Sequence, residues 1–524
     1  MFMKKAASIS LYDTTLRDGT QGEGISFSLL DKIRIAEKLG AFGMNYIEGG
    51  WPGSNPKDLA FFAEARKRNL HGAKLAAFGS TRRAGVIASK DHQIAQLLEA
   101  ETPVVTIFGK SWKLQVEKVL MVPHAENISM IHESVAHLKS HDREVFYDAE
   151  HFFDGYKDDA DFALATLDAA VRGGADMLIL CDTNGGSMPD EIASITSIVH
   201  ARYPDRVGIH THNDCGLGVA NALAAVGAGA TQIQGTINGY GERTGNCNLT
   251  TVIPCLQLKM GLHVVSDLTR LLEVSHFVDE LANCPPDPRA PFVGSTAFAH
   301  KGGMHVNAVA KTPAAYEHIE PGTVGNHQNI LVSELSGRSN ILMKAQELGL
   351  SLSKQDPAII RVLDRIKSLE AEGYEFEAAD ASLELLIQKE LGRHSPLFEL
   401  SGYHCSFRRG TGTSTTCEAT VLLREGDDVV ETTAEGDGPV NALDAALRKA
   451  LQHLHPWISL IRLSDYKVRI VDGGRGTAAR TRVHILSSEG TETWGTVGVS
   501  DNIIEASWMA LVDSLEFRAS RRPV

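Results

Sequence analysis

The segment His210-Thr211-His212 has the spacing that points most directly to chemistry in this chain of 524 residues. Side chains two residues apart on a β-strand point to the same side, so both imidazoles can face one position. Asp18, at the end of an earlier strand-like run, can add a carboxylate oxygen there. Such a mixed site suits one divalent metal, and Mn, Mg, Co or Zn would all fit. Asn246 can contribute a carbonyl oxygen, and the alternative is a pair of hydrogen-bonded core histidines.

Arg17 directly precedes Asp18 in the stretch LYDTTLRDGTQGEG, residues 11–24, and this pair has two interpretations. It is either a structural ion pair, or Arg17 is a fixed cation aimed at an oxygen that becomes negative during a reaction. One such donor can contribute roughly 3 kcal/mol in a dry site. The glycines that follow would leave room for a substrate.

Two further polar residues follow strand-like runs and are candidates for the same site. Glu150 is either a buried, paired carboxylate or a group that transfers protons. Thr183 is either a turn residue or a hydroxyl that binds a substrate carboxylate.

These residues lie within or directly after short apolar runs that alternate with helix-like segments. Strand–helix alternation predicts a parallel sheet. Eight units predict a closed (β/α)8 barrel, in which the active site lies at the C-terminal ends of the strands. A doubly wound open sheet is the alternative, but it normally has fewer units, and no GxGxxG follows the first run. The eight runs are residues 9–16, 44–50, 74–79, 103–109, 144–152, 177–185, 206–214 and 231–239.

The rest of the chain does not continue the alternation of strand-like and helix-like segments that predicts the barrel. We expect the catalytic barrel to cover residues 1–275, helical linker subdomains to cover 276–390, and an α+β domain to cover 391–524.

The last of these segments contains a weak internal repeat. VNALDAAL (440–447) and IEASWMAL (504–511) share the pattern Ala-x-x-x-Ala-Leu. Each follows strand-like segments and a predicted Gly-rich turn, EGDGP (435–439) or WGTVGVSD (494–501). The repeat predicts two β-rich halves, each closed by one helix. Two unrelated amphipathic helices are the alternative.

Composition narrows the class of protein. The net charge of −14 argues against a nucleic-acid or anionic-membrane partner. No stretch approaches the roughly 20 apolar residues that span a bilayer, and the N-terminal MFMKKAASIS lacks the apolar core of a signal peptide. The seven cysteines form no CxxC pair, which favours a protein of the reduced cytoplasm.

Several motifs resemble those of a known family. LYDTTLRDGTQGEG, HTHND and GERTGNCN resemble the α-isopropylmalate synthase and homocitrate synthase family of metal-dependent Claisen-condensing enzymes. YIEGGWPGSNPKD (46–58) and FAHKGGMHVNAVAKTPAAYEHIEPGTVGN (298–326) resemble one branch more narrowly, whose members condense acetyl-CoA with pyruvate to give (R)-citramalate. The resemblance covers nearly the whole chain. It implies a homodimeric transferase of isoleucine biosynthesis, with a C-terminal domain that binds isoleucine as a feedback effector.

The resemblance also implies roles for individual residues. Arg17 matches the arginine that stabilises the developing alkoxide, and Thr183 matches the hydroxyl that contacts the keto-acid carboxylate. His305 matches a histidine of the proton-transfer apparatus, which typically reaches the site from a partner subunit, and His300 competes for this role. Many relatives have His-Gln-Asp where this chain has His305-Val306-Asn307. The remaining matches are Glu150 and Tyr316 as catalytic groups and Asp18, His210, His212 and Asn246 as metal ligands.

Three other functions remain open at this point. The chain could make isopropylmalate or homocitrate, although Phe78 and Phe108 near two strand ends suggest a small keto-acid pocket. It could be an aldolase or lyase that runs the reverse reaction. It could also be a catalytically silent amino-acid sensor, against which the intact set of Arg17, Asp18, Glu150 and the HxH motif argues.

Overall fold

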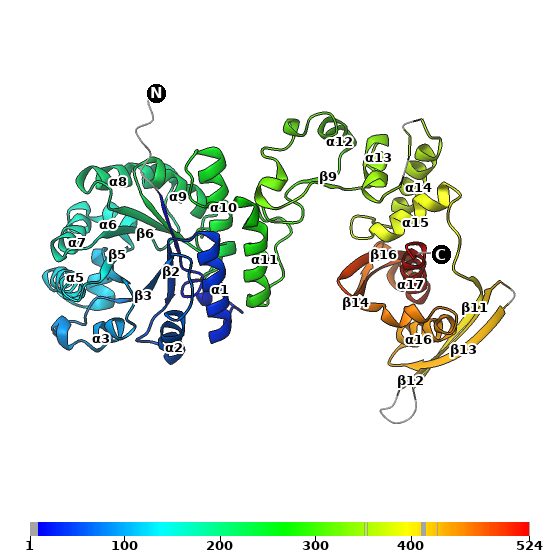
Figure 1. Ribbon diagram of the computed structural model, residues 1–524, viewed down its shortest axis with the longest axis horizontal. Helices are drawn as coiled ribbons and strands as arrows, with labels where there is room; N and C mark the ends of the chain where they lie inside the picture. Colours follow the sequence, from blue (N-terminus) through cyan, green and yellow to red (C-terminus); the bar gives the residue numbers. More distant parts are fainter. Residues whose placement is uncertain (1–8, 351, 354, 410–414, 427, 523–524) are drawn as a thin grey trace. The chain divides into compact units, whose positions relative to one another are not determined.

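The computed structural model describes residues 9–350, 352–353, 355–409, 415–426 and 428–522. They form two compact units (Figure 1). The first runs to Phe298 and includes Ile319–His327, and the second comprises Ala299–His318 and the chain from Gln328. Residues 1–8 lie outside the described residues. They make up most of the N-terminal segment that was expected not to be a signal peptide. Within the described residues, no helix has the length and apolar character needed to cross a bilayer.

Eight parallel strands of the first unit close into the predicted barrel. The first strand pairs with the eighth as well as with the second, so the sheet has no open edge. The (β/α)8 prediction is therefore confirmed, and the open doubly wound sheet is excluded. The strands are β1 (Ser10–Asp13), β2 (Tyr46–Gly50), β3 (Lys74–Ser80), β4 (Val104–Lys110), β5 (Glu144–Glu150), β6 (Met177–Asp182), β7 (Val207–Thr211) and β8 (Gln232–Gly235).

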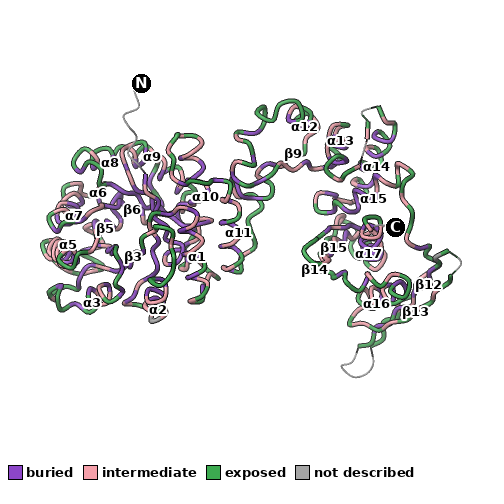
Figure 2. The backbone as a smooth tube through the Cα atoms, in the orientation of Figure 1, coloured by how far each residue is buried: buried purple, intermediate pink, exposed green. Residues whose placement is uncertain are grey.

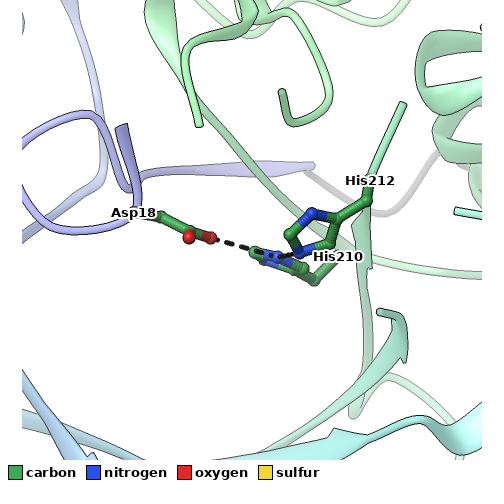
Figure 3. Close-up of side chains that lie close together, drawn as sticks. All are labelled: Asp18, His210 and His212. Atoms are coloured by element: carbon green, nitrogen blue, oxygen red, sulfur yellow. Dashed lines mark hydrogen bonds and ion pairs between the residues drawn. The ribbon is translucent and has the colours of Figure 1, made fainter. Parts of the chain in front are cut away.

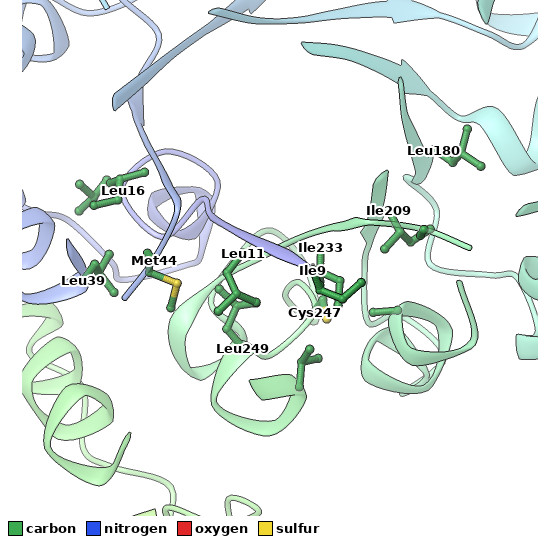
Figure 4. Packing of buried hydrophobic residues seen from close by; sticks show 14 of the residues in the cluster. Ile9, Leu11, Leu16, Leu39, Met44, Leu180, Ile209, Ile233, Cys247 and Leu249 are labelled. Atoms are coloured by element: carbon green, nitrogen blue, oxygen red, sulfur yellow. The ribbon is translucent and has the colours of Figure 1, made fainter. Parts of the chain in front are cut away.

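Helices surround this barrel and bury the outward faces of its strands (Figures 1 and 2). Leu11 of β1, Ile233 of β8 and Leu249 belong to the shared apolar core (Figure 4). The helices are α1 (Leu29–Phe42), α2 (Pro56–Ala65), α3 (His92–Glu99), α4 (Lys113–Gln115), α5 (His124–Lys139), α6 (Phe152–Asp158), α7 (Ala160–Gly173), α8 (Pro189–Arg202), α9 (Gly218–Gly227), α10 (Leu249–Pro254) and α11 (Leu271–Ala282). Residue 275, where a domain boundary was expected, lies within α11.

Local sequence fixes where these helices begin and end. In α1, Ser28 and Asp31 form a reciprocal capping box, with Ser28 N–H donating to Asp31 Oδ2 at 2.9 Å. The helix ends at Phe42 and is capped by Gly43, whose φ of 115° suits glycine.

The inward faces of the strands fill the barrel in layers. Tyr12, Ala76, Val104 and Phe146 form a small apolar cluster of their own, separate from the core outside the strands. Such packing makes the interior a solid core rather than a pore. The polar residues at the C-terminal strand ends therefore lie above a packed apolar core and not above an open channel.

The first strand is shorter than the predicted run of residues 9–16, because it ends at Asp13. Asp13 Oδ1 accepts a hydrogen bond from the Thr15 N–H at 2.9 Å, and Oδ2 accepts one from the Thr15 hydroxyl at 2.9 Å. This side-chain turn competes with strand pairing. The N–H groups of Arg17 and Asp18 then donate to Thr14 O at 3.1 and 2.8 Å. The turn thus presents Arg17 and Asp18 at the end of the barrel.

The second unit contains helices followed by two three-stranded antiparallel sheets, each continued by one helix. A short parallel pair, β9 (Ala299–His300) and β10 (Asn329–Ile330), accompanies α12 (Gly303–Val309). The other elements are α13 (Arg338–Glu347), α14 (Ala358–Glu372), α15 (Asp380–Glu390), β11 (Glu399–Arg409), β12 (Thr415–Glu425), β13 (Asp428–Gly436), α16 (Pro439–Gln452), β14 (Arg462–Ile470), β15 (Thr481–Glu489), β16 (Glu492–Ser500) and α17 (Ile503–Ser520).

The prediction of a Gly-rich turn at residues 494–501 is wrong, because these residues form most of β16. A Cβ added at Gly495 would lie 1.9 Å from Ala378 O, and one at Gly498 would lie 2.1 Å from Ala506 O. These glycines therefore allow another backbone to approach a strand closely, which is the second common use of glycine in sheets.

Candidate active site

Three side chains converge at the C-terminal end of the barrel (Figure 3). Asp18 Oδ2 lies 3.3 Å from His210 Nε2, which lies 3.3 Å from His212 Nε2. All three residues are buried, and one ligand atom from each falls within 4.8 Å of the others. His212 stands one residue beyond β7, but its backbone pairs with Asn246, so the imidazoles keep the same side.

The electrostatics of Asp18 and His212 favour the forms that bind a metal, whereas the Asp18 carboxylate favours the protonated form of His210. Burial raises the pKa of Asp18, but the Arg17 guanidinium and His210 outweigh it and hold that pKa below its usual range. Burial, with help from His210, lowers the pKa of His212 to about 3. Burial also lowers the pKa of His210, but its hydrogen bond to Asp18 outweighs this and raises it. At neutral pH the group therefore offers an ionised carboxylate and a neutral His212 imidazole.

The chemistry around Asn246 also fits a bound cation. Its Nδ2 donates to Tyr240 O at 3.2 Å. Its Oδ1 and the Nδ1 of His212 are buried and have no hydrogen-bond partner within the described residues. A buried, unsatisfied amide oxygen requires an explanation. A divalent ion beside His212 supplies one, so the carboxylate, two imidazoles and amide oxygen fit such an ion.

Arg17 forms an ion pair and also borders the reaction space. Its Nε donates to Glu48 Oε1 at 2.5 Å, and its Nη1 lies 3.3 Å from Asp18 Oδ1. Its guanidinium carbon stands 3.7 Å from the centre of the Phe78 ring. Burial lowers the pKa of Arg17, but the two carboxylates outweigh it and raise that pKa above its ordinary range. The cation is therefore held in one orientation and stays charged.

A cavity of about 230 Å³ joins these groups. The Thr183 hydroxyl oxygen accepts a hydrogen bond from the His151 N–H at 2.9 Å, which leaves its O–H to donate to a substrate. Glu150 forms an ion pair with Lys110. The lining residues are Arg17, Asp18, Gln21, Trp51, Phe78, Phe108, Asp148, Glu150, Cys181, Thr183, His210, His212, Glu242 and Arg243.

Aromatic rings form one side of the cavity. The ring centres of Phe78 and Phe108 are 5.6 Å apart in a stacked arrangement, and Trp51 meets them edge-on at 5.9 and 5.8 Å. Phe78 and Phe108 were singled out from the sequence, whereas Trp51 was not. These three rings make this side of the cavity apolar.

Sequence reasoning missed several residues of the site. Glu48 lies two residues before the end of the second strand-like run, so the same attention to strand ends would have found it. Lys110 likewise ends β4, beside Glu150. Gln234 left no such signal, because its contact with His210 depends on the register between β7 and β8.

The structure does not place His305 and Tyr316 in the barrel unit. Both belong to the second unit, where their rings stack with centres 4.3 Å apart and both residues are exposed. His300, the competing candidate, is buried, and its Nε2 lies 3.0 Å from Glu317 Oε1. Of the two histidines, His305 is the accessible one.

Family models match the chain in three consecutive segments. Residues 8–278 match the model described as HMGL-like. Residues 292–374 match the homocitrate synthase post-HMGL domain-like model, and residues 377–518 match the LeuA allosteric (dimerisation) domain.

Curated proteins of similar sequence include two named (R)-citramalate synthase. The protein from Aquifex aeolicus is 53% identical over 517 residues, which is 98% of each chain. The protein from Geobacter sulfurreducens is 51% identical over 513 residues, which is 97% of each chain. A probable 2-isopropylmalate synthase from Methanopyrus kandleri is 30% identical over 514 residues, 98% of this chain and 99% of its own.

Proposed function

The chain belongs to the (R)-citramalate synthases within the HMGL-like family, and from this premise we propose that it condenses acetyl-CoA with pyruvate. It is an enzyme, an acyltransferase by class. The products would be (R)-citramalate and CoA. The observation that carries the proposal is the single cavity in which Arg17, Thr183, Glu150 and the metal-binding group meet an aromatic side.

We propose that Asp18, His210, His212 and Asn246 hold a divalent metal. When bound, this ion would act as a Lewis acid on the keto group of the substrate. The donor set contains oxygen and nitrogen only, which suits Mn, Mg, Co or Zn.

The protein side chains would bind and orient pyruvate. The Thr183 O–H donates to the substrate carboxylate, and Arg17 faces the keto oxygen. The methyl group then lies against Trp51, Phe78 and Phe108, where a longer side chain would meet the rings.

A second cavity next to the first supports a proposed site for acetyl-CoA. It has about 290 Å³ and shares Arg17, Gln21 and Trp51 with the first. Its lining is polar and includes Ser54 and Lys57. We propose that the thioester arm of acetyl-CoA lies there, with its methyl carbon directed at the shared residues.

The reaction then proceeds through protein side chains. A proton leaves the acetyl methyl carbon through Glu150, His305 and Tyr316, and the resulting enolate carbon bonds to the keto carbon of pyruvate. Arg17 stabilises the negative charge on the former keto oxygen, which takes up a proton. Water then adds to the thioester, the C–S bond breaks, and CoA leaves as its thiol.

We further propose that the enzyme works as a homodimer under feedback control. The match to the LeuA allosteric (dimerisation) domain supports this, and His305 would reach the barrel of the partner chain. Isoleucine is the proposed effector, because citramalate precedes it in the pathway that the family resemblance implies. Inhibition of the intact dimer by leucine but not by isoleucine would contradict this assignment.

Thiol release from acetyl-CoA, measured over a panel of 2-keto acids, tests the function. We expect pyruvate to give the highest kcat/KM, ahead of 2-oxobutanoate, 2-oxoisovalerate and 2-oxoglutarate. A preference for 2-oxoisovalerate or 2-oxoglutarate would instead indicate isopropylmalate or homocitrate synthesis. Cleavage of citramalyl-CoA without any condensation would indicate a lyase.

A further inference from the structure

We propose that Gln234 is a positioning residue that fixes the tautomer of His210 and thereby presents its Nε2 to the metal. This inference rests on the proposed metal site. It assigns a role to a residue that is not itself a ligand and that lies on the strand next to His210.

The register of the barrel places the two residues side by side. His210 on β7 pairs with Gln234 on β8, so their side chains point into the barrel at the same level. Gln234 Oε1 lies 3.0 Å from His210 Nδ1. Gln234 has no exposed surface and His210 has 5%, so water cannot readily replace this contact.

A third residue decides which way the Gln234 amide points. Its Nε2 lies 3.4 Å from Asp148 Oδ1, and Asp148 is also buried. Burial raises the pKa of Asp148 to about 7, and in its ionised form this carboxylate only accepts hydrogen bonds, so the amide NH₂ faces it. The amide carbonyl must then face His210. Asp148 thus removes the ambiguity of an amide that could otherwise be reversed.

The amide orientation in turn sets the imidazole. A carbonyl oxygen accepts but cannot donate, so His210 Nδ1 must carry its hydrogen. In a neutral imidazole the other nitrogen then has the lone pair. That nitrogen, Nε2, is the one 3.3 Å from both Asp18 Oδ2 and His212 Nε2. Removing the carbonyl would leave a buried N–H unsatisfied and would release the ring to other tautomers and orientations.

Outer contacts of this kind typically change metal affinity by about 10- to 100-fold. We expect Gln234→Leu to weaken Mn²⁺ binding to the metal-stripped full-length protein by about that factor. Binding is followed through the electron paramagnetic resonance signal of free Mn²⁺, without substrate. Gln234→Glu keeps an oxygen acceptor at the same reach, and a proton shared with Asp148 would replace the amide N–H contact. This variant should therefore bind within about threefold of the unaltered enzyme, well below that range.

Gln232 provides a matched control on the same strand. It also faces the interior and is buried, but its Oε1 has no hydrogen-bond partner within the described residues. Gln232→Leu should therefore leave the Mn²⁺ affinity unchanged.

Two results would overturn the inference. Equal affinity in Gln234→Leu and the unaltered enzyme would show that the contact is dispensable. Equal weakening in Gln234→Leu and Gln234→Glu would show that side-chain packing matters, and not the acceptor. Failure of the unaltered enzyme to bind Mn²⁺ would instead contradict the metal site itself. Thermal melting of each variant identifies any that fails to fold, and the Leu and Glu variants together keep the comparison decisive.

Discussion

At the scale of single residues, Arg17 shows how one cation serves both stability and chemistry. It neutralises the buried carboxylate of Glu48 and also borders the cavity beside Asp18. The two interpretations of the Arg17-Asp18 pair are therefore compatible. The Glu48 contact fixes the guanidinium, and a fixed donor needs no reorganisation when charge develops on a substrate oxygen.

Replacing Arg17 with lysine separates these two contributions. Lysine keeps a positive charge for Glu48 but loses the planar fork of donors. We expect kcat to fall by about 100-fold or more, the scale of losing one oxyanion donor. The melting temperature should change little. Steady-state kinetics and calorimetry on the same preparation measure both quantities.

Arg17→Ala is the contrasting variant, because it leaves Glu48 buried without its cation. Removing one partner of a buried pair typically costs about 3–5 kcal/mol, so this variant should melt at a clearly lower temperature. If Arg17→Lys were destabilised as strongly as Arg17→Ala while its folded fraction kept full activity, Arg17 would have a structural role only.

At the scale of elements, the ends of β3 and β4 define the space for the keto-acid side chain. Phe78 is held under Arg17, with 3.7 Å between the guanidinium carbon and the ring centre. Phe108 is therefore the ring that can be changed with less effect on the catalytic cation. Its stacking on Phe78 and the edge contact with Trp51 fix its position.

Phe108→Leu should enlarge the cavity and shift the substrate preference. One methylene in an apolar pocket changes specificity by about tenfold or more. We expect the ratio of kcat/KM for 2-oxobutanoate to that for pyruvate to rise by about tenfold. Phe146→Leu is the control, because Phe146 packs with Tyr12 and Tyr46 in the barrel interior and does not line the cavity. An unchanged ratio in Phe108→Leu, or an equal rise in both variants, would contradict this assignment.

Features that depend on a few neighbouring residues could be predicted from the sequence. The alternation of strand-like and helix-like segments predicted the eight-stranded barrel. The two-residue spacing of His210 and His212 predicted that their side chains point to the same side of the strand. The premature end of β1 was missed because the Asp13 side chain competes with strand pairing for the Thr15 N–H.

Features that depend on distant neighbours were not predictable from sequence. From sequence alone, Gly495 looks like a turn residue. Its actual role, which is to allow the distant Ala378 O to approach the strand, is visible only in the structure. The contact of Gln234 with His210 depends on the register between β7 and β8, which the sequence does not show. The roles of His305 and Tyr316 came from family resemblance alone, because nothing in their local pattern indicates a distant site.

At the scale of the whole molecule, the residues proposed for catalysis are divided between two units. Glu150 belongs to the barrel unit, whereas His305 belongs to the second. A dimer in which each chain lends His305 to its partner would unite them, and this arrangement can be tested by complementation.

Glu150→Gln and His305→Ala should each abolish activity in their own homodimers. Mixed dimers of the two variants would contain one site with both residues intact, so activity should return when the variants are unfolded and refolded together. Thiol release before and after mixing measures this. No recovery in mixtures that contain heterodimers, verified with two affinity tags, would indicate that each chain uses its own His305.

The most direct test of the central claim is to remove and restore the metal. We expect the metal-stripped enzyme to lose pyruvate-dependent thiol release and to regain it with one equivalent of Mn²⁺ per chain. His210→Ala should remain folded but should neither bind that equivalent nor regain activity. Full activity in a preparation verified to be free of metal, or one bound equivalent in folded His210→Ala, would contradict the assignment of Asp18, His210 and His212 as the metal centre of a pyruvate-condensing enzyme.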